Sequence, residues 1–230
     1  MIREAMRSLA IDVGNTRAKV ALFEDGRMVS CSVCSDGMLP AADRCIASLT
    51  GARPEWLPAD CMEVSCKLKL PIRLDYATPE TLGSDRIAAA CAAWGLYEGR
   101  PIMVVDAGTC VTVDYVAKDG VYHGGAILPG IEMKFRALNT FTARLPLLNI
   151  SDAATACDPV GDSTCNSIVS GVVCALRYSL EGYARELSRR AGEEVQVVVT
   201  GGDATHLAAE WPIEPHLVMR GMNEILMMNL

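Results

Sequence analysis

Short apolar runs that end at a glycine recur along this chain, and they predict strands that lead into tight turns. Residues 9–26 read LAIDVGNTRAKVALFEDG. An apolar strand reaches a turn at Gly14, and a second strand follows it. The dipeptide Asp25-Gly26 is typical of a hairpin turn into a third strand. This segment therefore predicts three consecutive strands joined by tight turns.

A second segment repeats this pattern later in the chain. Residues 103–120 read MVVDAGTCVTVDYVAKDG and align with residues 9–26 without a gap. The alignment matches Asp12 to Asp106, and it also matches both glycine turns and both Asp-Gly dipeptides. Two copies of one supersecondary unit indicate two related halves, which we assign to residues 1–100 and 101–230.

Two other segments have the composition or spacing of helices. Ser84 is expected to cap an Ala-rich helix that runs as far as Tyr97. A longer helix is expected from a cap at residue 162 or 163 to a stop at Gly192. Its apolar residues recur at helical spacing and predict a core-facing stripe, part of which could serve a dimer interface. These residues are Ile168, Val172, Leu176, Leu180, Tyr183 and Leu187.

Glycine and proline mark the remaining turns. In residues 123–130, HGGAILPG, Pro129 stands where a helix would begin. A buried strand is expected over Val195–Thr200, and it ends at Gly201-Gly202, a position where α/β folds commonly bind ligands. The alternation of strands and helices predicts an α/β fold. A Rossmann domain and a P-loop are excluded, because the chain contains neither GxGxxG before a helix nor a Walker A sequence.

Composition and charge indicate which kind of molecule the protein binds. The chain has 230 residues, of which 50% are hydrophobic and 21% charged, and its net charge is −7. This acidic balance argues against a broad electrostatic grip on nucleic acid or on an anionic membrane. The chain also lacks an apolar run long enough to span a bilayer and a recognisable signal peptide. We therefore expect a cytoplasmic protein with a small-molecule partner, and no nucleic acid or membrane partner.

The cysteines and histidines offer little for metal or redox chemistry. Cys31 and Cys34 form a CxxC, but no second pair repeats the spacing, and a loop rather than a helix is expected to follow. A role for this pair is left open as the minor alternative. The other cysteines are expected to be reduced, small apolar residues, among them Cys91, Cys110, Cys165 and Cys174. The three histidines share no ligand spacing.

Each repeated turn combines a carboxylate with a glycine loop. Backbone N–H groups in such a loop can cradle phosphate, and the carboxylate can hold a cation that balances the phosphate charge. An ordinary Asx turn explains one such copy equally well, but two copies in register favour a polyphosphate site. Asp85 and Arg86 add polar groups at the start of a helix. Asp85 complements the helix dipole there, whereas Arg86 does not, which favours a polar ligand at this helix start.

The motifs together resemble a known family. The paired hairpins and the late glycine loop resemble the superfamily of actin, hexokinase and the 70-kDa heat-shock ATPases. More closely, the set resembles the type III pantothenate kinases, in the family's own order. Its members are Asp12–Thr16, Gly83–Arg86, Asp106–Thr109, Gly124–Gly130 and Thr200–Asp203. The resemblance implies duplicated actin-like, ribonuclease H-like halves, each a mixed β-sheet flanked by helices, with a nucleotide cleft between them.

The resemblance also implies an activity and a set of site residues. It implies ATP-dependent phosphorylation of pantothenate to 4'-phosphopantothenate, the first step of coenzyme A synthesis, by a homodimer. Asp85 would be the general base, and Asp106 would hold a monovalent cation, potassium or ammonium, besides the Mg²⁺ that accompanies ATP. The residues implied for ATP are Asp12, Val13, Gly14, Asn15, Thr16, Arg17, Ala18, Lys19 and Thr109. Those implied for pantothenate are Tyr76, Gly83, Ser84, Asp85, Arg86 and Thr164.

Departures from the family pattern are few. Ser84 stands where alanine is more usual, and residues 31–70 match poorly. A sugar kinase or small ATPase of the same superfamily stays open as an alternative, as does a nucleotide-binding regulatory protein without catalysis. The presence of Asp12, Asp85 and Asp106 favours an enzyme, because a protein that only binds nucleotide has no chemical need for all three carboxylates.

Overall fold

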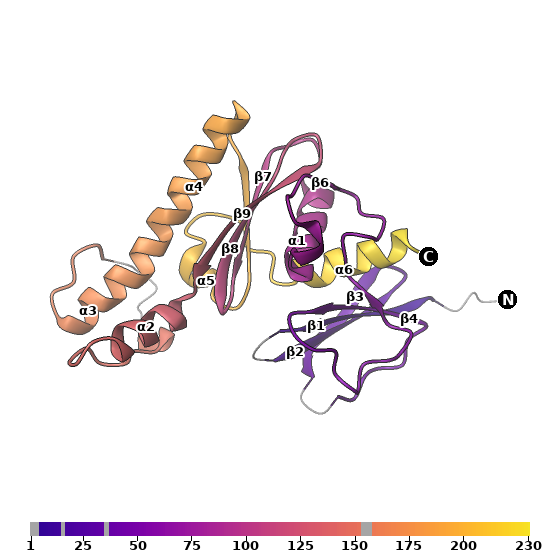
Figure 1. Ribbon diagram of the computed structural model, residues 1–230, viewed down its shortest axis with the longest axis horizontal. Coiled ribbons are helices and arrows are strands. Elements are labelled where there is room, and N and C mark those ends of the chain that lie inside the picture. The colour runs from indigo at the N-terminus through magenta and orange to yellow at the C-terminus, as the bar shows by residue number, and fades with distance from the viewer. Residues whose placement is uncertain (1–4, 15–16, 35–36, 153–157) are drawn as a thin grey trace. The chain divides into compact units, whose positions relative to one another are not determined.

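The computed structural model describes residues 5–14, 17–34, 37–152 and 158–230. The chain forms two compact units (Figure 1). The first unit takes residues 1–99, 118–124 and 216–230, so the C-terminal helix belongs to it. The second unit takes residues 100–117 and 125–215. The sequence-based boundary at residue 100 remains a prediction about how the duplication is divided.

The first unit is built on a five-stranded sheet of order β3-β2-β1-β4-β5. Its strands are β1 (Arg7–Val13), β2 (Ala18–Glu24), β3 (Arg27–Cys34), β4 (Arg44–Leu49) and β5 (Met62–Glu63). The first three strands pair antiparallel, whereas β4 pairs parallel with both β1 and β5. The unit also contains β6 (Arg73–Leu74), η1 (Pro79–Thr81), α1 (Ser84–Leu96) and α6 (Leu217–Met228). Asp25 and Gly26 both have positive φ, as the predicted Asp-Gly hairpin turn requires.

The two faces of this sheet have different coverings, because side chains alternate along each strand. One face carries Leu9, Ile11 and Leu22, which pack with Leu57 from a loop. The other face lies under α1 and α6, two helices that also pack against each other. Ser8 belongs to this second face, and its buried hydroxyl donates to Oδ1 of Asn223 on α6 at 2.7 Å. Asp12 and Ser48 follow on the same face at the carboxyl ends of β1 and β4.

The second unit repeats the start of the first. Its strands are β7 (Ile102–Ala107), β8 (Cys110–Val116), β9 (Val121–Pro129) and β10 (Gln196–Thr200), in the order β10-β7-β8-β9. The first residues of β9 belong to the first unit, where they pair with β6. As β1 does with β2 and β4, β7 pairs antiparallel with β8 and parallel with β10. Two mixed sheets of matching order confirm the predicted duplicated α/β plan.

Helices complete the second unit. They are α2 (Ile131–Thr140), η2 (Ile150–Asp152), α3 (Thr164–Val169), a π-helical turn η3 (Ser170–Cys174), α4 (Ala175–Ala191) and α5 (Ala204–Leu207). The long helix predicted from Ser163 to Gly192 is therefore confirmed at both ends but contains a π turn. Ser163 caps it by accepting from Asn166 N at 3.2 Å, and Gly192 ends it with φ of 74°. Its predicted apolar stripe packs into the core of this unit, so little of it is left for a dimer interface.

Two predictions of local detail were wrong. Ser84 is the first residue of α1 rather than its N-cap, which is Gly83 without a side-chain cap. The Ser84 hydroxyl bonds elsewhere, because the start of α1 lies against β4. Cys174, expected to be reduced, is disulfide-bonded, whereas Cys91, Cys110 and Cys165 are free thiols as expected.

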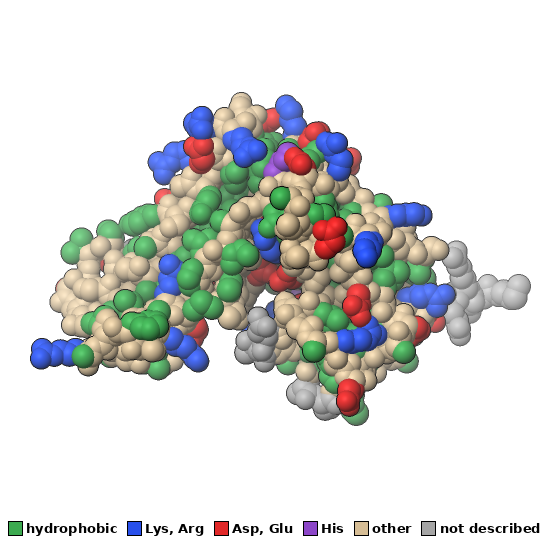
Figure 2. Space-filling model, in the orientation of Figure 1, with side chains coloured by type: hydrophobic (Ala, Val, Ile, Leu, Met, Phe, Trp, Pro, Cys, Tyr) green, Lys and Arg blue, Asp and Glu red, His purple; other side chains and the backbone are tan. Residues whose placement is uncertain are grey.

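The surface in Figure 2 shows acidic and basic side chains interspersed over both units. Among the described residues, no helix combines the length and the apolar character needed to cross a membrane.

Candidate functional site

The first hairpin places a carboxylate beside a lysine. Asp12 is the next-to-last residue of β1 and lies directly opposite Lys19 of β2. The turn between them closes through Gly14, whose N–H donates to Arg17 O at 3.1 Å. The predicted ATP residues Val13, Gly14, Arg17 and Ala18 lie in or next to this turn, and Asn15 and Thr16 lie outside the described residues. The hairpin therefore has the carboxylate, the lysine and the glycine turn that the sequence predicted.

Asp12 is electrostatically unusual. Burial raises its pKa to about 6, and the nearby carboxylate of Asp85 raises it as well. Lys19 and a hydrogen bond from Ser48 act in the opposite direction. Because burial and a like charge both disfavour an ionised carboxyl, Asp12 is held in an environment suited to a cation or a cationic ligand. A shifted carboxyl in such a setting is a functional-site candidate.

The start of α1 brings Asp85 to the same place. Asp85 is the second residue of the helix, and its Oδ1 accepts a hydrogen bond from Arg86 N at 2.8 Å. Gly83 makes room for this arrangement, because a Cβ there would lie 2.5 Å from Oδ1 of Asp85. Arg86 is buried, and its side-chain carbons pass close to Gly83. The predicted substrate motif Gly83–Arg86 thus forms one connected turn whose carboxylate interacts with Asp12.

Ser48, which carries no sequence motif, contacts both the Asp12 carboxylate and the start of α1. Ser48 of β4 is fully buried, lies opposite Asp12 in the parallel ladder and hydrogen bonds to its carboxylate. Its Oγ also lies 2.9 Å from the Oγ of Ser84. The only sequence signal was a polar residue near the end of an otherwise apolar strand, RCIASL. Such a residue has no motif of its own, and the parallel pairing of β1 with β4 gives it its neighbours.

The second hairpin has the same plan but different neighbours. Asp106 of β7 lies opposite Thr112 of β8, and opposite Thr200 of β10 on its other side. The gapless sequence alignment would have placed Val113 in the position of Lys19. A register that differs by one residue puts a threonine there instead, because side chains alternate between faces. Asp106 is thus flanked by two hydroxyl residues, whereas Asp12 is flanked by a lysine and a hydroxyl.

Oxygen atoms gather around Asp106. Gly201, at φ of +97°, approaches so closely that a Cβ there would overlap the Ala107 carbonyl and lie 2.5 Å from Asp106 Oδ1. The same carbonyl accepts from Asp203 N at 2.9 Å. The predicted ATP residue Thr109 lies in the two-residue turn between β7 and β8, and its carbonyl accepts from Gly130 N at 3.1 Å. The late glycine loop and the second hairpin therefore form one compact cluster.

The remaining predicted substrate residues lie apart along the chain. Tyr76 belongs to the first unit, where its ring centroid is 6.1 Å from that of Tyr122. A Cβ on Gly124 would lie 2.8 Å from the Tyr76 ring, so this glycine permits the ring's position. Thr164 is the exposed first residue of α3 in the second unit.

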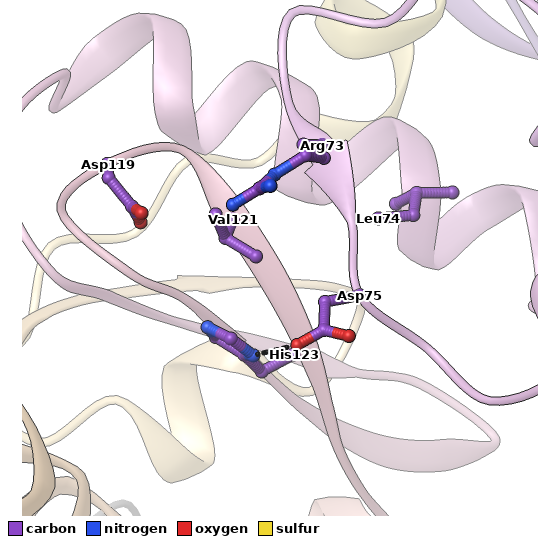
Figure 3. Close-up of a pocket in the computed structure, with 6 residues that line it drawn as sticks. All are labelled: Arg73, Leu74, Asp75, Asp119, Val121 and His123. Atoms are coloured by element: carbon purple, nitrogen blue, oxygen red, sulfur yellow. Dashed lines mark ion pairs between the residues drawn. The ribbon is translucent and has the colours of Figure 1, made fainter.

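The first unit also contains a surface pocket of about 320 Å³. Figure 3 shows its lining, which comes from β6 and the residue after it, from β9, and from the turn before β9. The lining residues are Arg73, Leu74, Asp75, Asp119, Val121 and His123. His123 Nδ1 pairs with Asp75 Oδ2 at 3.1 Å. None of the six is a predicted site residue.

The described residues contain no group of three His, Cys, Asp or Glu side chains that could hold a metal ion. Cys31 and Cys34 lie three positions apart on β3, so their side chains point to opposite faces of the sheet. The minor alternative of a CxxC site is therefore wrong for this strand. The groups near Asp106 are of another kind, namely threonine side chains and the Ala107 carbonyl.

Comparison with known proteins adds independent information. A family model described as type III pantothenate kinase matches residues 26–186. The type III pantothenate kinase of Phocaeicola vulgatus is 36% identical over 246 aligned positions, covering 96% of this chain and 98% of the relative.

Solved structures share the fold. A Campylobacter jejuni protein assigned to the Baf family of transcriptional activators gives a TM-score of 0.66 at 20% identity, covering 95% of this chain and 97% of that one. A Listeria monocytogenes protein assigned as an N-acetylmannosamine kinase gives 0.52 at 10% identity, covering 96% and 99%. At these identities, the two structures show a shared fold and nothing further. The family model matches more than half of the chain, and a member is 36% identical over nearly its full length, so the chain belongs to the type III pantothenate kinase family.

Proposed function

We propose that this protein transfers the γ-phosphoryl group of ATP to the terminal hydroxyl of pantothenate, giving 4'-phosphopantothenate, the first step toward coenzyme A. The observation that carries the proposal, beside family membership, is the meeting of Asp12 and Asp85 in the first unit. The Asp12 carboxylate lies near the end of β1, just before a glycine turn and opposite Lys19. The Asp85 carboxylate lies in the first turn of α1. Phosphoryl transfer requires this combination of a phosphate cradle and a positioned base.

In the proposed mechanism, Asp85 accepts the proton of the pantothenate hydroxyl as its oxygen attacks the γ-phosphorus. The bond from phosphorus to the β,γ-bridging oxygen breaks, and ADP leaves with that electron pair. The hydrogen bond from Arg86 N orients the Asp85 carboxylate. Lys19 and the backbone N–H groups of the first hairpin bind phosphate oxygens. Most of the rate enhancement then comes from alignment and charge neutralisation.

Two cations fit the residues present. Mg²⁺ bound with ATP would neutralise charge on the phosphates, and the partly buried carboxylate of Asp12 would interact with that ion directly or through water. Asp106, with the carbonyl of Ala107 beside it and threonines on both sides, offers hard oxygen donors but no lysine across the strand. This donor set suits a monovalent cation, so we assign potassium or ammonium to Asp106 and a phosphate contact to Thr109.

The pantothenate side is assigned to Tyr76, Thr164 and the Gly83–Arg86 turn. The buried Arg86 would offset the negative charge of the vitamin's carboxylate in an acidic protein. We further propose a cytoplasmic homodimer. The predicted stripe on the long helix is buried in the second unit, so the exposed Met133 and Phe141 are better candidates for apolar contact between subunits.

The test is a coupled assay with ATP, Mg²⁺, potassium and pantothenate. Asp85→Asn should lower kcat about a hundredfold or more, because it removes the proton acceptor without changing size. Equal turnover of the wild type and Asp85→Asn would contradict the assigned base. If sugars replaced pantothenate as acceptor, the protein would be a sugar kinase. ATP binding without turnover on any metabolite would favour a regulatory protein.

A second assay tests the monovalent cation. Replacing potassium by sodium should slow the wild type several-fold, whereas Asp106→Asn should be slow in both salts. A wild type that works equally well in potassium and sodium would remove this role from Asp106.

A further inference from the structure

Ser48 occupies a position that costs stability unless its hydroxyl is fully used. It has no exposed surface and lies near the carboxyl end of β4, whose other buried residues, Ile46 and Ala47, are apolar. A buried hydroxyl without partners is strongly unfavourable. Ser48 has two, the carboxylate of Asp12 on β1 and the hydroxyl of Ser84 on α1. It therefore links a strand residue to the start of a helix.

Ser84 completes the link on the helix side. Its Oγ accepts a hydrogen bond from Leu49 N at 3.1 Å and lies 2.9 Å from Ser48 Oγ. A weaker contact to Leu49 O, at 3.4 Å, is a second possible use of its hydrogen. All of these partners belong to β4. The Ser84 side chain is thus committed to the sheet, and the next residue along the helix is Asp85.

The direction of the hydrogen bonds follows from the chemistry of the groups. An ionised Asp12 can only accept, so Ser48 donates to it. Ser48 Oγ is then left to accept the hydroxyl hydrogen of Ser84, while Ser84 Oγ accepts from Leu49 N. One continuous chain of donors runs from the β4 backbone through Ser84 and Ser48 to the Asp12 carboxylate. Each hydroxyl both donates and accepts, and such chains reinforce themselves.

We propose that Ser48 and Ser84 form a hydroxyl bridge that holds the Asp85 carboxylate in register with the Asp12 hairpin, and that both serines are positioning residues for phosphoryl transfer. The proposal rests on the proposed function. Asp12 and Asp85 repel each other electrostatically, so without the bridge the start of α1 would be free to move away from β1. The bridge opposes that repulsion and fixes where the base stands relative to the phosphates.

The proposal predicts an effect on the chemical step. A misplacement of about 1 Å between reacting groups can lower the rate about a hundredfold. Without the bridge, the start of α1 would be more flexible, and we expect a part of that loss. Ser48→Ala and Ser84→Ala should each lower kcat about tenfold or more, with smaller changes in KM for pantothenate and ATP. Ser84→Thr keeps the hydroxyl and should retain most of the wild-type kcat.

A double mutant tests whether the two serines act as one unit. If the bridge is a single chain, removing either hydroxyl breaks it, so Ser48→Ala/Ser84→Ala should have nearly the kcat of Ser48→Ala alone. Losses that multiply in the double mutant would mean two independent effects and would overturn the bridge.

Ser8→Ala is the matched control. Ser8 is equally buried, lies on the same sheet face and bonds a helix residue, Asn223, but at the opposite end of β1 from Asp12. All variants are assayed well below the Tm measured for each. Ser8→Ala should lower Tm while kcat stays at the wild-type value. A kcat loss in Ser8→Ala as large as in Ser48→Ala would reduce the effect to general packing and overturn the proposal.

The outcomes separate this inference from the proposed function. If the wild type phosphorylates pantothenate but folded Ser84→Ala has an unchanged kcat, the bridge has no positioning role and only this inference fails. If the wild type itself shows no pantothenate turnover, the proposed function fails and the inference fails with it. Should Ser48→Ala not fold, the half-exposed Ser84, compared as alanine and as threonine, still decides the question.

Discussion

Asp12 lies directly opposite Lys19 across the first hairpin, and the Lys19 ammonium is one of two groups that hold the pKa of the partly buried Asp12 below what burial alone would give. In the second hairpin the corresponding pair is Asp106 and Thr112. The first hairpin therefore has a lysine ammonium opposite its aspartate, whereas the second has a threonine there. This difference underlies the separate assignments of phosphate binding to the first hairpin and cation binding to the second.

Lys19→Met should raise KM for ATP about tenfold or more and lower kcat. The change removes a phosphate partner and leaves Asp12 without its cross-strand cation. Steady-state kinetics with varied ATP measure the effect, and Lys19→Arg should recover part of it. Arg27→Met, at the far end of the same sheet on exposed β3, is the control. If Lys19→Met and Arg27→Met raised KM equally, the change would reflect net charge rather than a site.

Asp12→Asn should inactivate the enzyme and yet stabilise it at pH 8. The pKa of Asp12 is raised from 3.8 to about 6 in the folded protein. The folded state therefore holds its proton where the unfolded state has lost it, and stability falls as pH rises from about 4 through 6. The gain for Asp12→Asn at pH 8 should be on the order of 2 kcal/mol, vanishing below pH 4.

Urea unfolding of Asp12→Asn and wild type at pH 4 and pH 8 measures this difference. Asp25→Asn, on the exposed hairpin turn, serves as the control for loss of one carboxylate. A destabilised Asp12→Asn at pH 8 would mean that the ionised carboxylate supports the fold rather than a ligand.

Gly221→Ala should unfold the first unit or destabilise it severely. A Cβ on this residue of α6 would overlap the backbone carbonyl of Ala88 on α1, and backbone cannot move aside as a flexible side chain can. Gly182→Ala is the matched control, because this helical position in α4 has open space around it. That substitution should stabilise the protein by about 0.5–1 kcal/mol through helix propensity. Thermal unfolding of both variants measures these changes in stability. A wild-type Tm for Gly221→Ala would contradict the close packing of α1 on α6.

Glu224 on α6 gives a second pH effect away from the site. Burial raises its pKa to about 7, and Arg220 offsets this in part. The protonated form is favoured by folding, so its stabilising contribution is complete below about pH 4.5 and is lost as pH rises through 7. Because Glu224 is only partly buried, the expected gain for Glu224→Gln at pH 8 is only about 1–2 kcal/mol.

Chemical unfolding at pH 4.5 and pH 8 checks the Glu224 prediction, with exposed Glu98→Gln as the control. The kcat of Glu224→Gln should match that of the wild type, since α6 contributes no residue to the proposed chemistry. Equal stability of Glu224→Gln and wild type at both pH values would argue against a buried carboxyl.

Much of the site was predictable because its groups sit at sequence positions with strong local rules. Glycine at 14 and 108 marks tight turns, and an acidic residue two positions earlier ends a buried strand. The cap at Ser163 and the stop at Gly192 are likewise local features of the chain. Ser84 was misplaced as a cap because the competing partner, β4, is distant in sequence. Ser48 was missed for the same reason, since a lone serine in an apolar strand carries no pattern.

The sequence by itself determined the duplication, the strand–turn–strand hairpins with Asp12 and Asp106, and the helix that begins near Asp85, because each follows from local periodicity and turn chemistry. Only the tertiary structure decided their neighbours. Parallel pairing of β1 with β4 brought Ser48 to Asp12, and the packing of α1 brought Ser84 and Asp85 beside them. A one-residue difference in register placed Thr112, not Val113, opposite Asp106. Such pairings depend on contacts between distant segments, which no local pattern encodes.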